Sequence, residues 1–202
     1  VMPLANLLRD PGTTLDAVQA LLDGLDHDGR VAATRGCDLA ELTRLWALAA
    51  TATPIDAAHF VGDKGPLEAV AHDGWNSLPL PASARQFQKV FCRAPGRDDV
   101  IYGYNEGDAK GLIGPGYFLL VPTTGTEGWA GRGAWVVDYY QVPRGPVPEG
   151  WPKVVPNWWG LQLFVYNGTR DFMRRVSTHV SIGKPWARGI ELPFCFVLVR
   201  RD

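Results

Sequence analysis

One acidic side chain stands on an otherwise apolar strand face in this sequence. Residues 134–142 alternate as a β-strand, and Asp138 shares a face there with Val136, Tyr140 and Val142. Burial of a carboxylate is costly unless it is paired or its pKa is raised. Asp138 is therefore a candidate general base. The alternatives are an exposed strand face or a structural ion pair with an arginine.

Two histidines extend this candidate catalytic set. His179 is expected where a long helix meets the sheet, as a general base, a metal ligand or a residue favoured by the helix dipole. His72 precedes Asp73 in a loop-like region, and it is either a general base or a surface histidine. Adjacent residues of an extended chain point to opposite sides, so the spacing does not make His72 and Asp73 a dyad.

Aromatic side chains with a polar tip are concentrated in the later part of the chain. Such side chains line pockets that hold and orient an apolar ligand, and they also fill ordinary cores. The candidate ligand-binding residues, beside Asp138, are Tyr102, Tyr104, Trp135, Tyr140 and Trp186.

Metal and cofactor motifs are missing from the sequence. Its histidines lack paired spacing, and Cys37, Cys92 and Cys195 are too far apart for a typical zinc site or disulfide framework. The glycine-rich runs 107–116 and 125–133 match neither a phosphate loop nor a dinucleotide fingerprint. We expect no metal and no organic cofactor.

Composition predicts a globular protein. The chain has 202 residues, 46% hydrophobic and 20% charged, with a formal net charge of −1, which disfavours a nucleic-acid-binding protein. It has neither a membrane-length apolar run nor a signal pattern, so we expect a soluble, cytoplasmic protein. We expect a single domain, 1–202, with a helical part at 1–50 and a sheet-plus-helix core at 83–202.

Capping residues predict two amphipathic helices near the N-terminus. Thr13 or Thr14 caps the first helix, and Asp38 with Glu41 forms a capping box that opens the second. Each helix has one apolar face, so each needs a surface to pack on.

The spacing of apolar residues after Asn157 predicts one long helix that reaches His179. Asn157 is its N-cap, and Gly168 lies on its apolar face, where the helix would touch the sheet most closely. The other members of that face are Leu161, Val165, Phe172 and Val176.

About five strands accompany this helix, mostly antiparallel by connection length. They cover 100–105, 117–121, 134–142, 180–186 and 191–199. The second and last of them are apolar on both faces, so both sides of the sheet must be covered.

Two further segments are ambiguous. Residues 67–72 are a candidate short strand, and residues 83–93 fit a helix or a strand, with the helix preferred. The fold class we predict is α+β: a curved sheet, open or closed into a partial barrel, packed on the long helix and on the two N-terminal helices.

Three functions follow from these patterns. The first is binding of a small apolar or aromatic molecule between sheet and helix. The second is a cofactor-independent isomerase, lyase or hydrolase that uses Asp138, His72 or His179 as its base. The third is an interaction module or homodimer that uses the proline-rich strip 143–156 and Trp158-Trp159.

Overall fold

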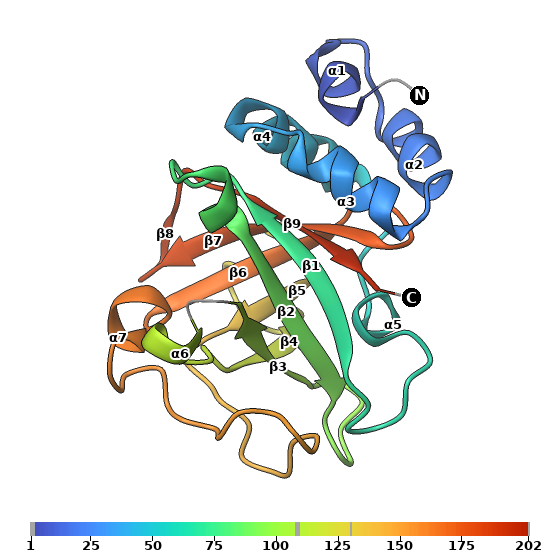
Figure 1. Ribbon diagram of the computed structural model, residues 1–202. Helices are drawn as coiled ribbons and strands as arrows, with labels where there is room; N and C mark the ends of the chain where they lie inside the picture. Colours follow the sequence, from blue (N-terminus) through green and yellow to red (C-terminus); the bar gives the residue numbers. More distant parts are fainter. Residues whose placement is uncertain (1–2, 108–109, 130, 202) are drawn as a thin grey trace.

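The computed structural model describes residues 3–107, 110–129 and 131–201. Over these residues its nine strands form one antiparallel sheet, most of which closes on itself (Figure 1). The strands are β1 (Val70–Asn76), β2 (Gln86–Arg93), β3 (Ile101–Glu106), β4 (Phe118–Pro122), β5 (Trp135–Asp138), β6 (Thr169–Arg175), β7 (Val180–Ala187), β8 (Ile190–Glu191) and β9 (Phe196–Arg200). Over the described residues, eight of these strands pair in the order β6-β5-β4-β3-β2-β1-β9-β7, and a β6–β7 pairing closes the barrel. The short β8 is an additional strand beside β7.

Alternation along each strand sends one set of side chains into the barrel and the other set outside. On β9, Phe196 and Leu198 belong to the cluster inside the barrel, whereas Val197 and Val199 belong to the cluster under the N-terminal helices. Both faces of β9 are therefore buried, which explains its continuous apolar sequence.

Four short helices cover the outer face of β1, β7 and β9 (Figure 1). They are α1 (Leu4–Arg9), α2 (Leu15–Asp23), α3 (His27–Arg35) and α4 (Leu39–Leu48). Thr14 caps α2, and Asp38 and Glu41 form the capping box of α4, which confirms those two predictions. Their apolar side chains, such as Leu22 and Leu45, pack with Val180 in one core cluster.

The segment after these helices closes one end of the barrel. It contains the 3-10 turn η1 (Ala49–Thr51) and the helix α5 (Ala57–Val61). Phe60 of α5 is fully buried against Phe91, with ring centroids 5.5 Å apart, and its carbonyl oxygen lies 2.8 Å from His72 Nε2.

The opposite end of the barrel is surrounded by short elements rather than filled by one. These are η2 (Ala82–Arg85), α6 (Lys110–Ile113) and α7 (Gln162–Val165). Figure 1 places α6 and α7 side by side at the left of the barrel, with α5 on the other side. We call this end the barrel mouth. Within the described ranges, no helix has the length and apolar composition needed to cross a membrane.

The predicted fold class is wrong. The protein has a closed eight-stranded barrel with short helices, not a curved five-stranded α+β sheet packed on a long helix. Residues 169–175 of the expected helix form β6, and only Gln162–Val165 is helical within it. Gly168 has a φ of 80°, a left-handed conformation that ends any helix there.

The helix preferred for residues 83–93 is also wrong, because Gln86–Arg93 is strand β2. Both errors have one cause. A strand with polar and apolar residues on both faces loses its two-residue periodicity, so a helical spacing of Phe and Val appears by chance. Strand pairing across the closed barrel then decides the conformation.

Candidate functional site

The barrel mouth contains a cavity of about 710 Å³. Its floor is formed by inward-facing side chains of β2, β3 and β6 and by Tyr139, which follows β5, and its rim by η2, α6, α7 and the segment before β9. An eight-stranded barrel is just wide enough to be filled by side chains or to hold one small ligand. A cavity of this volume at a barrel mouth has the size of a small-molecule site.

A cluster of four polar side chains forms the floor of the mouth cavity. Lys89 Nζ donates to Asn105 Oδ1 at 2.9 Å and to the hydroxyl of Tyr139, and it lies 3.4 Å from Asp171 Oδ2. All four residues are buried. Lys89, Asn105 and Asp171 belong to different strands, and Tyr139 directly follows β5. We call these residues the lysine cluster.

Burial shifts the acid–base behaviour of the lysine cluster toward uncharged forms. Desolvation lowers the pKa of Lys89, although Asp171 opposes the change, and desolvation raises the pKa of Asp171, although Lys89 opposes it. Desolvation also raises the pKa of Tyr139 well above its usual value. Burial therefore disfavours the charges of Lys89 and Asp171, whereas the proximity of the two groups favours them.

Four aromatic rings surround the Lys89 amine. Nζ lies 5.0 Å from the ring centroids of Phe118 and Tyr139, 5.2 Å from that of Phe196 and 5.7 Å from that of Phe87. Rings at such distances attract a cation and exclude water. The amine thus has a dry environment beside an open cavity.

Three inward-facing glycines make room for these rings. Phe87 is paired with Gly74, Phe118 with Gly103 and Phe196 with Gly183 on the neighbouring strands.

At each glycine, a Cβ would meet the ring of the paired phenylalanine; at Gly74 the distance would be 2.6 Å. Each phenylalanine therefore lies flat over its glycine, a cross-strand arrangement that fills the space left by the missing side chain. The three phenylalanine rings around Lys89 therefore depend on these glycines for their positions.

The polar groups of the cluster are held by the chain around them. Asn105 Nδ2 donates to the Gly116 carbonyl at 2.9 Å, and the Gly116 amide donates to Gln162 Oε1 at 2.7 Å. Tyr166 stacks on Tyr139 with ring centroids 5.3 Å apart. The segment that contains α7 therefore positions the cluster as well as lining the mouth.

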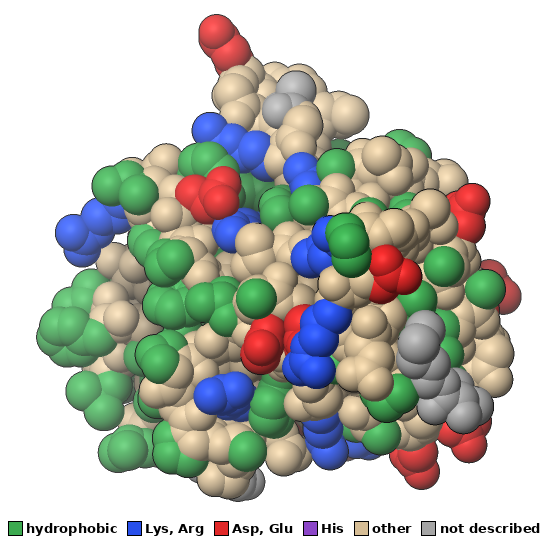
Figure 2. Space-filling view, turned by 90° about the horizontal axis from the view of Figure 1, so that it is seen from above, with side chains coloured by type: hydrophobic (Ala, Val, Ile, Leu, Met, Phe, Trp, Pro, Cys, Tyr) green, Lys and Arg blue, Asp and Glu red, His purple; other side chains and the backbone are tan. Residues whose placement is uncertain are grey.

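Charges at the rim of the cavity are paired. Lys110 Nζ lies 2.6 Å from Glu106 Oε2, and the Tyr104 hydroxyl donates to the same carboxylate at 2.9 Å. The short helices α6 and α7 also carry exposed apolar side chains: Leu112 is 77% exposed and Phe164 is 81% exposed. In Figure 2, hydrophobic side chains gather along the left edge, the side on which Figure 1 places α6 and α7.

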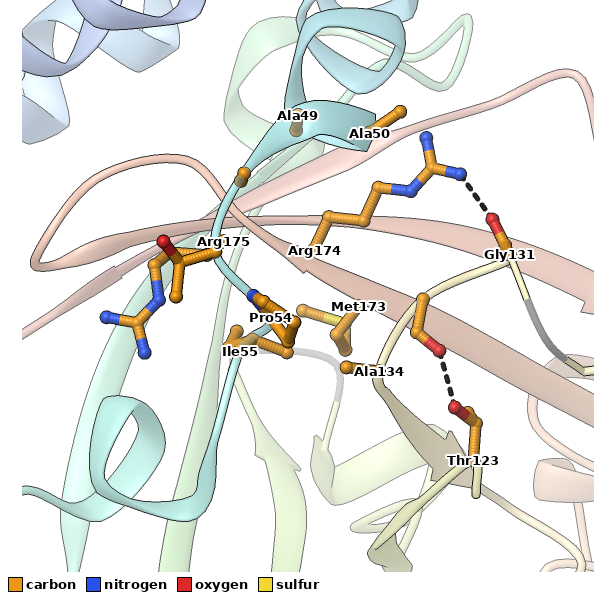
Figure 3. Close-up of a pocket in the computed structure, with 13 residues that line it drawn as sticks. Ala49, Ala50, Pro54, Ile55, Thr123, Gly131, Ala134, Met173, Arg174 and Arg175 are labelled. Atoms are coloured by element: carbon orange, nitrogen blue, oxygen red, sulfur yellow. Dashed lines mark hydrogen bonds between the residues drawn. The ribbon is translucent and has the colours of Figure 1, made fainter. Parts of the chain in front are cut away.

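A second, smaller cavity of about 260 Å³ lies between the segment around Pro54 and β6 (Figure 3). Its polar side chains are held by the chain itself. Arg174 donates to the carbonyl oxygens of Gly131 and Trp46, and Thr123 donates to that of Gly133. The described residues that line it include no buried acid–base cluster, so it is the weaker candidate for a ligand site.

Asp138, Tyr140 and Trp186 lie on the outer face of the barrel. Asp138 Oδ1 is 3.2 Å from Arg170 Nε, so the arginine partner considered from the sequence is present. The Arg170 guanidinium lies 4.1 Å from the Tyr140 ring centroid, and that of Arg132 lies 3.8 Å from the Trp186 ring. These contacts form a stack of rings and guanidinium groups, not a cavity.

The remaining predicted ligand-binding residues are divided between the two faces. Tyr102 and Tyr104 lie on the outer face of β3, and Tyr104 packs on Trp151 at 4.8 Å between ring centroids. Trp135 faces inward, toward the closed end, 6.2 Å from the Phe60 ring centroid. None of the predicted ligand-binding residues lines the mouth cavity formed by the described residues, so their ligand-binding roles stay predictions.

The two histidines lie near each other, since the charge of His179 contributes to the lowered pKa of His72. His72 is fully buried inside the barrel on β1, in register with Lys89, and desolvation lowers its pKa to about 3. His179 precedes β7, with Nδ1 3.1 Å from Arg200 Nη2. Asp138 lies elsewhere, beside Arg170 on the outer face of the barrel, and none of the three residues lines the mouth cavity of the described chain. Their catalytic roles stay predictions.

Sequence reasoning missed Lys89, Asn105, Tyr139 and Asp171. One signal was present: Lys89 alternates with Phe87 and Phe91, so a strand at 86–93 puts a lysine on an aromatic face. Asp171 likewise alternates with Met173. Both signals were hidden because the two segments were assigned to helices.

The fold and the site define a closed eight-stranded antiparallel β-barrel with a ligand-sized cavity and a buried lysine cluster in one mouth. Comparisons with known protein families, curated proteins and solved structures find no match to this chain. Among the residues that the structure describes, no three His, Cys, Asp or Glu side chains are grouped as metal ligands.

Proposed function

We propose that this protein binds one small, uncharged, largely apolar molecule in the mouth cavity. The observation that carries this proposal is the combination of a cavity of about 710 Å³ with a small convergent polar cluster at its floor. Sites of this kind bury most of the ligand in apolar surroundings and orient it with a few polar groups.

Charge balance supports an uncharged ligand. The charged side chains of the described cavity wall are Lys89, Asp171, Lys110 and Glu106, and they form two pairs of opposite sign. A charged ligand would be buried without a countercharge, which is costly. A hydroxyl, amide or carbonyl group can instead form hydrogen bonds with the lysine cluster.

The exposed apolar side chains beside the mouth support an apolar ligand. Leu112 and Phe164 directly adjoin Ile113 and Val165, which line the cavity. Such a surface next to a cavity marks a route by which an apolar molecule enters.

Saturation binding of the neutral fluorescent probe N-phenyl-1-naphthylamine tests this proposal. We expect one site per chain, with competition by decanol and no competition by decanoate. Ala84→Trp places a large side chain at the cavity rim on η2 and should weaken binding at least about tenfold.

Ala82→Trp is the matched control, because Ala82 lies on the same 3-10 turn and is not part of the described cavity wall. Its affinity for the probe should equal that of the unmodified protein. Equal affinities for all three proteins, or no saturable binding, would contradict the proposal.

The homodimer and the cytoplasmic location stay predictions. Trp158 and Trp159 are 65% and 63% exposed, whereas Trp151 of the proline-rich strip packs on Tyr104 and Tyr117. Light scattering across a range of protein concentrations tests the dimer.

A further inference from the structure

We propose that Lys89 is a covalent binding site, whose Nζ forms a reversible imine with an apolar aldehyde or ketone held in the mouth cavity. This inference rests on the proposed function, because the cavity must first hold the carbonyl compound. It adds a ligand class and a bond to the binding site described above.

The position of the amine is the first argument. Lys89 Nζ lies at the cavity floor, within hydrogen-bond distance of Asn105 and Tyr139 and enclosed by phenylalanine rings. A carbonyl compound that enters from the mouth with its polar end first reaches this nitrogen. Lysines in apolar pockets are the ones that react as neutral amines.

Asp171 supplies the proton transfer that imine formation requires. Its carboxylate, 3.4 Å from Lys89 Nζ, takes one proton from the ammonium group and leaves a neutral amine. Burial favours this exchange, since desolvation lowers the pKa of Lys89 and raises that of Asp171. Exclusion of water by the apolar ligand strengthens both shifts.

Bond formation then balances without any further reactant. The Nζ lone pair attacks the carbonyl carbon, the π electrons move to oxygen, and a proton from nitrogen completes a carbinolamine. The protonated Asp171 gives its proton to the hydroxyl group, which leaves as water while the C=N bond forms. The nitrogen has lost two protons, both carried away by the water, and nothing is oxidised or reduced.

Tyr139 and Asn105 position the reacting carbonyl group. The Tyr139 hydroxyl donates to Asn105 Oδ1 at 3.2 Å, and rotation of this hydroxyl directs the same proton to a carbonyl oxygen near Lys89. Because burial raises the pKa of Tyr139 well above its usual value, the hydroxyl stays protonated and remains a donor.

Lys110 and Lys184 occupy cavity-lining or buried positions, but neither combines burial with a place at the cavity floor. Lys110 stands at the rim, is about one-third exposed and is paired with Glu106 at 2.6 Å. Lys184 is buried on the outer face of β7 and is paired with Glu191 at 3.3 Å. Selectivity for Lys89 is therefore the property to test.

The experiment traps the imine. The purified protein is incubated with limiting decanal and sodium cyanoborohydride, and the reduced adduct is located by peptide mass spectrometry. We expect one adduct per chain at Lys89, at least about tenfold above that at exposed Lys153, because the bound aldehyde is held beside the amine.

Variants show whether the adduct depends on the site. Ala84→Trp should suppress trapping at Lys89, and Ala82→Trp should not. Asp171→Asn, which keeps the amine but removes the proton acceptor and its negative charge, should shift half-maximal trapping at Lys89 to lower pH and leave that at Lys153 unchanged.

Decanol binding separates the two proposals. Decanol that binds while Lys89 is labelled no more than Lys153 overturns the imine and leaves the proposed function standing. If the protein binds neither the fluorescent probe nor decanol, both the imine and the proposed function are contradicted. Lys89→Arg, which keeps the charge but removes the primary amine, should lose the adduct; an adduct of undiminished yield in this variant also overturns the proposal.

Discussion

Lys89 on β2 and Asp171 on β6 meet inside the barrel, with Nζ 3.4 Å from Oδ2, although β2 and β6 are not neighbours in the sheet. The pair therefore connects opposite walls of the barrel across the floor of the mouth cavity. Both side chains are nearly inaccessible to solvent, at 3% and 8% exposure.

Removal of one partner should cost far more than removal of both. Lys89→Met leaves the carboxyl of Asp171 buried without its cation, and we expect a loss of about 3 kcal/mol of unfolding free energy at neutral pH. The loss should shrink in acid as Asp171, whose pKa burial raises, becomes protonated. Urea unfolding measures both quantities.

The double variant Lys89→Met with Asp171→Leu is the matched control for charge removal. Because both charges are then absent, its stability should return to within about 1 kcal/mol of the unmodified protein or exceed it. Additive losses from the two substitutions would contradict the view of the pair as mutually dependent charges.

Gly103→Ala should destabilise the barrel and disturb the rings around Lys89. A Cβ at this position meets the Phe118 ring and the Val90 carbonyl, so the ring, which lies 5.0 Å from Lys89 Nζ, must move. We expect a loss of about 1–3 kcal/mol in denaturant unfolding, together with weaker binding of N-phenyl-1-naphthylamine.

Gly111→Ala is the control for Gly103→Ala, because a Cβ at Gly111 of α6 meets open space. Alanine there should be neutral or slightly stabilising, since it raises helix propensity. Equal changes in unfolding free energy at Gly103 and Gly111 would show that the ring over Gly103 is not tightly packed.

Acid should destabilise the protein through His72. Burial lowers its pKa from 6.5 to about 3, so the unfolded chain binds a proton in this interval and the native state does not. Stability is therefore lost as the pH falls from 6.5 toward 3, by up to about 5 kcal/mol from this residue.

His72→Gln removes the titrating group and keeps a donor for the Phe60 carbonyl, which accepts from Nε2 at 2.8 Å if that nitrogen is protonated. The variant should show a shallower loss of stability across the same pH interval. A remaining slope is expected from buried His59, whose pKa desolvation also lowers. If the unfolding free energy falls with pH equally in His72→Gln and in the unmodified protein, this prediction is wrong.

Asp73 should contribute stability above its ordinary pKa. Burial alone would raise its pKa, but hydrogen bonds from Arg201, Gln88 and His27 outweigh burial and lower it from 3.8 to about 2. The contribution is therefore present above pH 3.8 and is lost as the pH falls toward 2.

Asp73→Asn should cost about 2 kcal/mol at neutral pH and less below pH 3.8. Thermal unfolding at several pH values measures the difference. Asp99→Asn removes a carboxylate that pairs with Arg97 at the exposed β2–β3 turn, and it should leave stability unchanged. A loss at Asp99 as large as that at Asp73 would mean that general charge balance, not these hydrogen bonds, is responsible.

Local signals in the sequence were sufficient for the N-terminal helices and for several strands. The caps at Thr14 and Asp38 depend on contacts within one turn, so a single short segment contains all the information. Residues 100–105 and 117–121 nearly match β3 and β4, because alternation and apolar runs are also local patterns.

The candidate site could not be predicted from such local patterns. Lys89, Asn105, Tyr139 and Asp171 are separated by tens of residues along the chain, and they meet only because the barrel closes. Asp138 looked like the buried acid of a pocket, but its face of β5 points outward to Arg170. One residue of register decides which face a side chain occupies.

The sequence by itself determined the capped helices, the antiparallel strands and the need to bury both faces of β9. Tertiary structure decided that residues 86–93 and 169–175 are strands, that eight strands close into a barrel, and that Lys89 reaches Asp171. The physical reason is that capping and alternation act over a few neighbouring residues, whereas barrel closure and the pairing of buried charges depend on contacts between segments far apart in the chain.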